Sequence, residues 1–269
     1  MPELPEVETV VRALRPEITG EVISHLEIIW PKMLATPHPP EQRYHQPIQS
    51  VDRRGKYILL NLPSGTIIIH LRMTGRLYTH TPDETQEPYL TAIFHFHSGK
   101  HLYFQDTRKF GRIYFTPDAT AFLRQLGPEP LGAAFTAQWM HHQLGKRHRQ
   151  IKPLLLDQTF LAGLGNIYVD EALFQAGIHP LSLSNAIPVA KIGKLHRAVR
   201  ALLRNAIKAQ GTTIINFQHG ENRSGSFQHQ LKVYRRSGQP CTRCKTPVKK
   251  MVVGQRGTHF CPNCQILYA

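Results

Sequence analysis

The sequence predicts an α+β protein with a β-rich first half of sandwich or barrel type, a helical second half and a zinc-bound hairpin near its end. Three observations support this fold class. Strand-like segments bounded by turn residues recur as far as Phe115. Apolar residues at helical spacing dominate the chain beyond Phe135. Two Cys-x-x-Cys pairs, separated by sixteen residues, lie close to the last residue.

The first six residues, Met-Pro-Glu-Leu-Pro-Glu, predict a secondary amine placed directly before a helix. Pro2 is small enough for the initiator methionine to be removed, and the amine that remains is a nucleophile. The positive end of the helix disfavours the ammonium form of Pro2, and Glu3 is a neighbouring proton carrier. Most Met-Pro starts have no chemical role, so this interpretation depends on the rest of the chain. Pro5 suits the first helical turn, and the buried helical face would consist of Val7, Val10, Val11 and Leu14.

The segments with strand character are separated by turns rich in glycine, proline or serine. The clearest hairpin turns at Pro63-Ser64-Gly65, and a second turns at Ser98-Gly99-Lys100. Residues 31–49 have only a weak pattern and predict a loop. We expect strands at residues 21–30, 56–62, 66–71, 91–97, 101–105 and 112–115.

The composition changes at Leu-Gly-Pro-Glu-Pro-Leu-Gly, residues 126–132, which indicates a linker. Beyond it, Thr136 is a candidate N-cap, and Asn166 opens a helix that Gly177 stops. Pro188 begins a long helix capped by Gly211, and residues 217–230 predict a mobile loop. We therefore expect an N-terminal catalytic domain at 1–125, a linker at 126–135, a helical domain at 136–230 and a zinc finger at 231–269.

The charge of the chain indicates a polyanionic partner. Its 269 residues include 33 Lys and Arg against 18 Asp and Glu, a formal net charge of +15. Nucleic acid fits better than a membrane, because no apolar run approaches the ~20 residues of a bilayer span. The N-terminus lacks a signal-peptide core, so we expect a cytoplasmic protein whose cysteines do not form disulfides. Nothing in the sequence indicates oligomerisation, and we expect a monomer.

The strongest single motif is Cys241-Thr242-Arg243-Cys244 with Cys261-Pro262-Asn263-Cys264. Four thiolates at this spacing predict one tetrahedral zinc ion, Zn²⁺. Four protein ligands leave no open position, so the zinc would be structural. Two redox-active pairs are the alternative interpretation. The zinc would hold a hairpin at residues 248–260, whose tip carries Arg256, a residue suited to gripping a phosphate.

Lys56, Met73, Phe110 and Arg108 each allow an ordinary and a functional interpretation. Lys56 follows Arg-Arg-Gly and is either a solvated lysine at a strand edge or a phosphate clamp. Met73 and Phe110 fit a core, but beside Arg108 on a basic protein they also fit a wedge between bases.

Other polar residues add weaker signals. Asn166 follows Gly-Leu-Gly and can donate a hydrogen bond to a phosphate. Arg147 and Lys152 belong to a basic segment that is either a solvated face or part of a basic surface. His95 and His97 stand out among sixteen histidines, but they lack the carboxylates of a catalytic metal site, and we interpret them as surface or packed residues.

Together these motifs resemble the formamidopyrimidine-DNA glycosylases, bacterial enzymes that remove oxidised purines from DNA. The resemblance runs nearly from end to end. It includes the Pro-Glu-Leu-Pro-Glu-Val-Glu-Thr start, Arg-Arg-Gly-Lys-Tyr around Lys56, Ile-Ile-His-Leu-Arg-Met-Thr-Gly around Met73 and Arg-Lys-Phe-Gly from Arg108. It continues through Leu-Gly-Pro-Glu-Pro-Leu, Gly-Leu-Gly-Asn-Ile-Tyr and Ala-Gly-Ile-His-Pro to the four cysteines.

The resemblance implies a β-sandwich flanked by helices, then a helix–two-turn–helix domain with the zinc finger. Its substrate would be duplex DNA with oxidised purines or abasic sites, in the cytoplasm and nucleoid of a bacterium. Pro2 would attack C1′ of the damaged nucleotide, with Glu3 as acid and base, and the imine would allow β- and δ-elimination assisted by Lys56 and Arg256. The implied DNA contacts are His70, Met73, Arg108, Phe110, Arg147, Lys152, Asn166 and Arg256.

Three departures from the family pattern concern DNA contacts and lesion preference. Thr107 replaces a proline before the Arg-Lys-Phe-Gly motif, and Tyr89-Leu90-Thr91 replaces His-x-His. The third is the loop at residues 217–230, which has a sequence of its own.

Three alternative functions remain open. Leu4 argues against an endonuclease VIII-like enzyme for oxidised pyrimidines, which usually carries Gly there. A tautomerase with a catalytic N-terminal proline would need neither the positive charge nor the zinc hairpin. A non-catalytic zinc-ribbon protein that binds damaged DNA is the third alternative.

Overall fold

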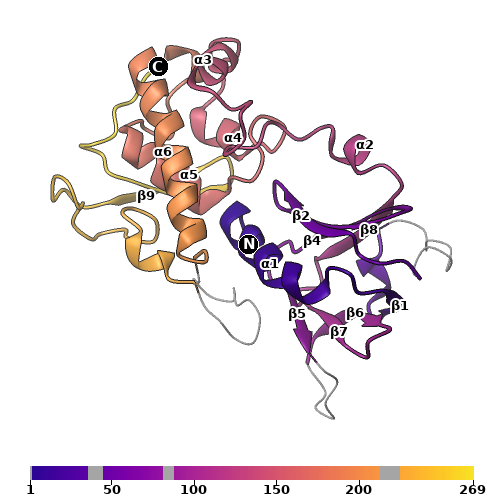
Figure 1. The fold of residues 1–269 in the computed structure, drawn as a ribbon. Helices are drawn as coiled ribbons and strands as arrows, with labels where there is room; N and C mark the ends of the chain where they lie inside the picture. The colour runs from indigo at the N-terminus through magenta and orange to yellow at the C-terminus, as the bar shows by residue number, and fades with distance from the viewer. Residues whose placement is uncertain (1, 36–44, 81–87, 213–224) are drawn as a thin grey trace. The chain divides into compact units, whose positions relative to one another are not determined.

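The computed structural model describes residues 2–35, 45–80, 88–212 and 225–269. It confirms the predicted α+β class. The chain forms two compact units, one of Met1–Gln125 with Ala209–Ser226 and one of Leu126–Lys208 with Phe227–Ala269 (Figure 1). Among the described helices, none has the length and apolar character that crossing a bilayer requires.

The first unit is a sandwich of two antiparallel four-stranded sheets. One sheet has the strand order β1-β6-β7-β5, and the other has the order β2-β3-β4-β8. The first sheet consists of β1 (Ile23–Ile28), β6 (Leu90–Phe96), β7 (His101–Gln105) and β5 (Arg76–His80). The second consists of β2 (Ser50–Arg54), β3 (Tyr57–Leu62), β4 (Gly65–His70) and β8 (Arg112–Thr116).

The predicted strands are present, but β2 and β5 were not expected from the sequence. Both are edge strands of five residues, with the sequences Ser-Val-Asp-Arg-Arg and Arg-Leu-Tyr-Thr-His. Charged and polar residues on an edge strand discourage pairing with other chains. The same residues hide the apolar alternation by which a strand is recognised.

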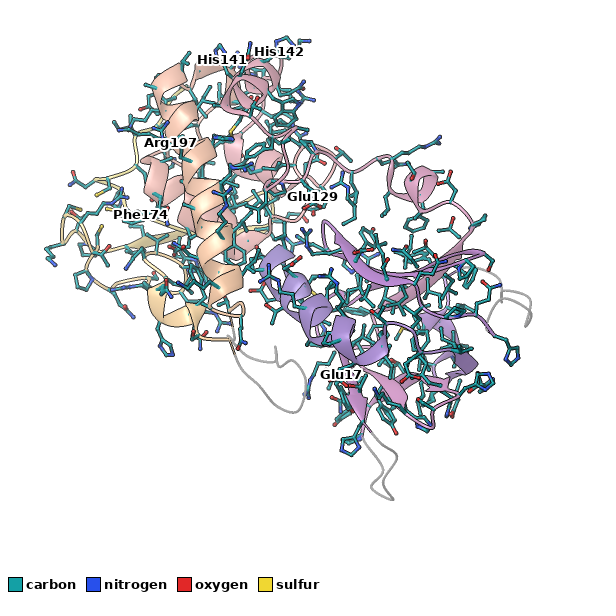
Figure 2. All side chains as sticks on the ribbon, in the orientation of Figure 1. Glu17, Glu129, His141, His142, Phe174 and Arg197 are labelled. Atoms are coloured by element: carbon teal, nitrogen blue, oxygen red, sulfur yellow. The ribbon has the colours of Figure 1, made fainter. Side chains whose placement is uncertain are left out.

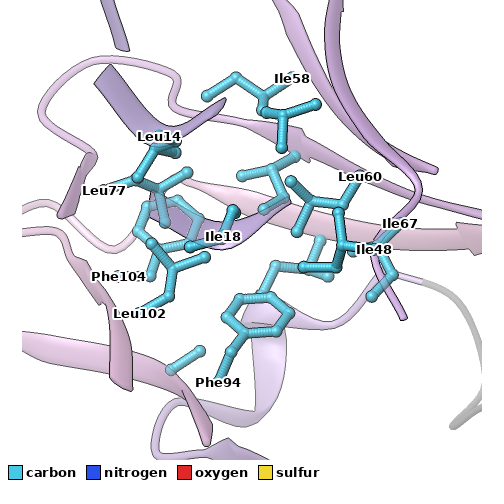
Figure 3. Close-up of a cluster of buried hydrophobic side chains, with 14 of the residues drawn as sticks. Leu14, Ile18, Ile48, Ile58, Leu60, Ile67, Leu77, Phe94, Leu102 and Phe104 are labelled. Carbon is cyan, nitrogen blue, oxygen red and sulfur yellow. The ribbon is translucent and has the colours of Figure 1, made fainter. Parts of the chain in front are cut away.

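The core of this unit lies between the two sheets. Alternate residues of β3 and β7 are buried, as expected for strands with one face in a core. Helix α1 (Leu4–Ile18) contacts β2, β3 and β5 and adds its apolar face. Figure 3 shows part of this cluster, with Leu14, Ile18, Ile48, Ile58, Leu60, Ile67, Leu77, Phe94, Leu102 and Phe104 labelled.

A partly buried ion pair ties α1 to the turn between β2 and β3. Arg53 Nε lies 2.9 Å from Glu8 Oε2, and the same guanidinium donates to the carbonyl of Gly55. Arg12 Nε reaches the other Glu8 oxygen at 2.8 Å. Burial alone would raise the pKa of Glu8, but the hydrogen bonds from Arg12 and Arg53 lower it below its ordinary value. These bonds therefore fix the position of the start of α1 relative to the residues that follow Gly55.

The second unit is built around α5 (Asn166–Ala176), which contacts α4, α6 and β10. Thr136 Oγ1 accepts the N–H of Trp139 and caps α3, and Gly177, at φ 71°, ends α5 in the left-handed conformation. The remaining elements are α2 (Ala119–Leu123, in the first unit), α3 (Ala137–Gly145), α4 (Ile151–Leu156), α6 (Val189–Lys208), β9 (Lys249–Val253) and β10 (Arg256–Phe260), with short 3₁₀ turns at Pro31–Met33, Ser184–Ala186 and Phe227–Gln230.

The loop predicted at residues 217–230 falls in two parts. Residues 217–224 lie outside the described residues. Phe227–Gln230, in the second part of the predicted mobile loop, form a 3₁₀ turn. The Phe227 side chain is buried, and its ring lies 5.9 Å from that of Tyr168, so tertiary packing fixes this segment despite its lack of periodicity.

We expect Glu8→Gln to lower the free energy of unfolding by about 1–2 kcal/mol at neutral pH, because both guanidiniums lose a charged acceptor. The folded-state pKa of Glu8 is depressed, so its contribution is present above the ordinary value of 4.5 and is lost as pH falls through the lower, folded value. The difference from wild type should therefore shrink in acid. Denaturant unfolding at several pH values measures it.

Glu17→Gln is the matched control, because Glu17 lies on the same helix and is half-exposed in its ion pair with Lys100 (Figure 2). It should change the free energy of unfolding by less than about 0.5 kcal/mol. Equal effects of the two substitutions, or a Glu8 effect independent of pH, would contradict the role of the Glu8–Arg53 pair.

Candidate active site and zinc centre

Pro2 and Glu3 lie at the N-terminal end of α1, and both are buried. Glu3 is the N-cap residue of this helix and forms a capping box with Glu6. The backbone N–H of Glu3 donates to Glu6 Oε2 at 2.9 Å. The capping box fixes the backbone that immediately follows Pro2, so the position of its ring nitrogen is set by the helix.

Glu6 also holds a segment that lies far away in the sequence. The backbone N–H of Thr212 donates to Glu6 Oε1 at 2.7 Å, and the Glu6 side chain is only 2% exposed. A Cβ on Gly211, whose φ is +82°, would lie 2.9 Å from Glu6 Oε1, so only glycine fits there. The N–H of Ser226 donates to the carbonyl of Ala209 at 2.9 Å. The two chain ends that flank residues 213–224 are thus joined beside Glu6.

Lys56 and His70 lie at neighbouring ends of β3 and β4. The Lys56 side chain is 6% exposed and that of His70 is 8% exposed. Burial, with the charges of Arg72 and Lys56, lowers the pKa of His70 to about 3. His70 is therefore neutral at physiological pH, and its Nδ1 accepts the N–H of Arg72 at 2.9 Å. The proton of the ring is consequently on Nε2.

A buried carboxylate organises the loop that carries Arg108 and Phe110. Asp106 is fully buried, and its Oδ2 accepts the N–H of Gly111 at 2.7 Å. Its Oδ1 accepts the N–H of Arg108 at 3.2 Å and the hydroxyl of Thr74. Thr74 follows Met73, so one carboxylate connects both loops that carry the predicted wedge residues.

The exposed part of this loop is an arginine–aromatic pair. The guanidinium of Arg108 lies 4.7 Å from the centre of the Phe110 ring, and Phe110 is 45% exposed. Lys109 between them has φ 57°, a conformation that places its neighbours on a tight turn. Thr107 stands where the resemblance expects a proline, and the hydrogen bonds of Asp106 restrain the loop.

In the second unit, Asp170 on α5 is the centre of a buried polar cluster. Lys152 Nζ lies 2.6 Å from Asp170 Oδ1, and both side chains are fully buried. The N–H of His259 on β10 donates to Asp170 Oδ2 at 2.9 Å. Lys152 Nζ also reaches the carbonyl of Gly257 at 3.3 Å. This cluster attaches the hairpin of β9 and β10 to α4 and α5.

Lys152, a predicted DNA contact, is buried in this structure. Its side chain is 0% exposed and its ammonium is paired with Asp170. Burial of a paired charge makes Lys152 a positioning residue for the residues that follow Arg256. Arg147, in contrast, is partly exposed, and its guanidinium donates to the side chain of Gln143 at 2.6 Å.

Asn166 and Arg256 lie close together in this unit. Asn166 Nδ2 donates to the carbonyl of Gly257 at 2.9 Å, and Arg256 is the exposed first residue of β10. Asn166 Oδ1 is buried without a hydrogen-bond partner among the described residues. One N–H of the amide remains for another acceptor. The hydrogen bond to Gly257 therefore fixes Asn166 relative to Arg256, and both are predicted phosphate-binding residues.

The four cysteines form one cluster. All four Sγ atoms lie within 4.8 Å of one another, and this is the one group of three or more candidate metal ligands found in the described part of the chain. Cys241 and Cys264 Sγ are 3.9 Å apart, and Cys244 and Cys261 Sγ are 3.4 Å apart. A tetrahedral zinc ion with Zn–S bonds of about 2.3 Å requires sulfurs about 3.8 Å apart. The cluster fits that requirement.

The surroundings of the sulfurs also fit a bound cation. The N–H of Arg243 points to Cys241 Sγ and that of Cys264 points to Cys261 Sγ, both at 3.4 Å. Burial and the neighbouring sulfurs raise the pKa of Cys264, which a cation bound among the sulfurs would offset. The sulfurs pack against Phe174 of α5, Val233 and Val248.

Tyr89 and Thr91 stand at one of the departures from the family pattern. Thr91 is fully buried and its hydroxyl donates to the carbonyl of Phe104 at 2.9 Å. Tyr89 is 59% exposed with φ 62°. Glu6, Asp106 and Asp170 were not predicted from the sequence as residues that organise the site. The sequence feature that could have identified them is a carboxylate within an otherwise apolar motif or a loop motif.

Three family models match the chain in order. They describe a formamidopyrimidine-DNA glycosylase N-terminal domain at residues 1–113, an H2TH domain of that glycosylase at 126–218 and a zinc finger found in FPG and IleRS at 238–266. The formamidopyrimidine-DNA glycosylase of Pelotomaculum thermopropionicum is 44% identical over 98% of this chain and 99% of the relative. That of Bacillus licheniformis is 43% identical at the same coverage.

Solved structures agree with these relatives. A Lactococcus lactis FPG mutant in complex with Fapy-dG-containing DNA is 37% identical, with a TM-score of 0.90 over 98% of this chain and 99% of that one. MutM in complex with carbocyclic 8-oxo-G-containing DNA has the same identity, TM-score and coverage. The zinc-finger match and the four-cysteine cluster together show a structural zinc site.

We expect Lys152→Met to lower the free energy of unfolding of the zinc-loaded protein by about 3–5 kcal/mol, because the fully buried Asp170 would lose the ammonium that lies 2.6 Å from it. Lys146→Met is the matched control, since Lys146 is exposed in the same unit. It should change stability by less than about 0.5 kcal/mol. Denaturant unfolding measures both, and a stable Lys152→Met protein would contradict a structural role for Lys152.

We expect zinc removal by a chelator, or the substitution Cys244→Ser, to unfold the hairpin of β9 and β10, because the zinc–sulfur bonds supply folding free energy to this small element. Amide exchange at residues 249–260 should become fast while the sandwich stays protected. Thr242→Ser, at an exposed position of the same motif, is the control. Slow exchange in metal-free protein would show that the zinc is dispensable for the hairpin.

Proposed function

The chain belongs to the formamidopyrimidine-DNA glycosylase family, and we propose that it excises oxidised purines from duplex DNA as a bifunctional glycosylase and AP lyase of base excision repair. Its substrates are 8-oxoguanine, formamidopyrimidines and abasic sites. The observation that carries the proposal is the placement of Pro2 directly before α1, beside the capping box of Glu3 and Glu6. The net charge of +15 suits a polyanionic substrate.

The nucleophile in this proposal is the secondary amine of Pro2, free once Met1 has been removed. The helix N-terminus disfavours its protonation, so the lone pair is available to attack C1′ of the damaged nucleotide. The bond from C1′ to the base breaks, and the base leaves with a proton. Opening of the sugar ring then gives an iminium ion between C1′ and the proline nitrogen. Glu3 is the group placed to carry protons in these steps.

The iminium ion explains why a lyase accompanies the glycosylase. Its positive charge acidifies the C2′ proton, and loss of that proton expels the 3′ phosphate by β-elimination. A second elimination expels the 5′ phosphate, and the sugar is released when water regenerates the amine. A one-nucleotide gap with phosphate ends remains. We assign Lys56 and Arg256 supporting roles in these eliminations.

We propose further that Lys56, Asn166 and Arg256 hold the phosphates that flank the lesion. Arg147 extends the basic surface, while Lys152 acts indirectly through Gly257. A base that reacts at C1′ has to leave the stack. The exposed Arg108–Phe110 pair, with Met73, suits the gap that this leaves, since an apolar wedge and an arginine can replace the lost stacking. We also include His70, as a neutral donor, among the DNA contacts.

The organisation of the whole protein follows the same proposal. Residues 1–125 carry the amine, 136–230 form the helix–two-turn–helix domain after the linker 126–135, and 231–269 form the zinc finger. We propose that the protein acts as a monomer in the bacterial cytoplasm and meets its substrate in the nucleoid. The resident metal is a single structural zinc ion, which holds the Arg256 hairpin and takes no part in the chemistry.

We expect borohydride to trap a covalent adduct on a duplex that contains 8-oxoguanine opposite cytosine, because the iminium ion is reduced to a stable amine. Peptide mapping should place the adduct on Pro2, with Met1 absent. Pro2→Gly and Glu3→Gln should lose turnover but keep binding the duplex. Glu17→Gln, on the same helix, should behave as wild type.

The same experiment separates the alternatives. Faster trapping on oxidised pyrimidines than on 8-oxoguanine would indicate an endonuclease VIII-like preference. Binding without an adduct on either lesion or on an abasic duplex, from protein with a processed N-terminus, would indicate a non-catalytic DNA-binding protein. The abasic duplex tests the amine chemistry alone, since no base has to be recognised.

A further inference from the structure

Three histidines form a row across adjacent strands of the first unit. His25 on β1 is paired with His95 on β6, and His95 is paired with His101 on β7. Their sequence neighbours Leu26 and Phe94 point into the core, so the histidines lie on the opposite, outer face of the sheet. His25 is exposed, and the other two are partly exposed. This face lies outside the site proposed above.

One ring nitrogen of His95 faces one ring nitrogen of His101. His95 Nδ1 and His101 Nε2 are 3.0 Å apart, and the ring centres are 4.3 Å apart. The other nitrogen of each ring is also held. His95 Nε2 lies 3.1 Å from Glu27 Oε2, and His101 Nδ1 lies 3.1 Å from the hydroxyl of Tyr103.

This arrangement matches the requirements of a two-histidine metal site. Histidines that ligate a metal usually have their second nitrogen held by a carboxylate or another polar group, which orients the ring. With metal–nitrogen bonds of about 2.0–2.1 Å, two ligands at a right angle are about 2.9 Å apart, whereas tetrahedral ligands are about 3.3 Å apart. The observed 3.0 Å is nearer to the right angle, which square-planar or tetragonal Ni²⁺ and Cu²⁺ prefer over Zn²⁺.

We propose that His95 and His101 bind one divalent transition-metal ion of the nickel or copper class on the outer face of the β1-β6-β7-β5 sheet. Glu27 and Tyr103 orient the two rings, and water fills the remaining positions. His25 stands next in the row, with its ring centre 5.7 Å from that of His95.

The bland alternative is a chain of hydrogen bonds. Tyr103 would donate to His101, His101 to His95 and His95 to Glu27, which satisfies every nitrogen without a metal. A second histidine pair provides a comparison. His45 Nδ1 and His97 Nε2 are 3.3 Å apart, but within the described residues neither ring has a carboxylate or hydroxyl partner. If exposed histidine pairs bind metal regardless of support, this pair should bind equally well.

The test is calorimetric titration of the full-length, zinc-loaded protein with Ni²⁺ in a non-coordinating buffer, with zinc content measured before and after. We expect one saturable equivalent of Ni²⁺ and no loss of zinc. His95→Gln and His101→Gln should each weaken binding at least tenfold. Glu27→Gln should weaken it about 10–100-fold, the usual cost of removing an orienting partner. Broadening of the His95 and His101 ring signals in NMR spectra by paramagnetic Ni²⁺ identifies the ligands independently.

The control is His142→Gln, because His142 is an exposed histidine on α3 of the other unit (Figure 2). It should leave the affinity unchanged. The proposal is overturned if the wild type shows no saturable binding, or if His97→Gln weakens binding while His101→Gln does not. It is also overturned if Glu27→Gln has no effect, since unsupported rings would then suffice. These positions are at the surface, so the variants should fold, and circular dichroism verifies this.

Discussion

Buried carboxylates that accept backbone N–H groups determine where the candidate site residues lie. Glu6 holds the backbone beside Pro2, Asp106 holds the loop of Arg108, and Asp170 holds the strand that begins with Arg256. Glu171 binds three consecutive N–H groups at residues 232–234 in the same way. A buried carboxylate without hydrogen-bond donors is unstable, and so is a buried backbone N–H group that has no partner in a helix or sheet. A hydrogen bond between the two removes both costs. Glu6, Asp106 and Glu171 therefore fix irregular segments, whereas Asp170 attaches a strand to the helices.

This dependence explains which parts were predictable from the sequence. The helix after Pro2, the hairpin strands and the four-cysteine site have their signals within a few residues, so periodicity and spacing identify them. Glu6 and Asp170 bond partners that are distant in the chain, 206 residues away for Glu6 with Thr212 and 89 for Asp170 with His259. No local pattern reveals such a pair. β2 and β5 were missed for the different reason that edge strands carry the polar residues of a loop.

Lys152 illustrates the limit of composition arguments. Arg147 and Lys152 belong to one basic segment, yet the first is partly exposed and the second is fully buried. A run of basic residues predicts a basic surface, but it does not show which residue of the run is buried instead. The sequence shows no carboxylate near His95, but the structure places one beside it, because Glu27 comes from a neighbouring strand. In both cases the deciding neighbour is supplied by tertiary structure.

Helix α5 bears at one end the residue that bonds Gly257 and at the other the aromatic ring on which the zinc cluster packs. The helix is 11 residues long, or about 16 Å at 1.5 Å per residue. A single inserted residue would lengthen it by about 1.5 Å and turn one end by about 100° relative to the other. The zinc finger contacts both ends of the helix, through Gly257 and through the zinc cluster, so it could not follow that movement. Insertions and deletions among relatives should therefore fall in the connecting loops and not within this helix.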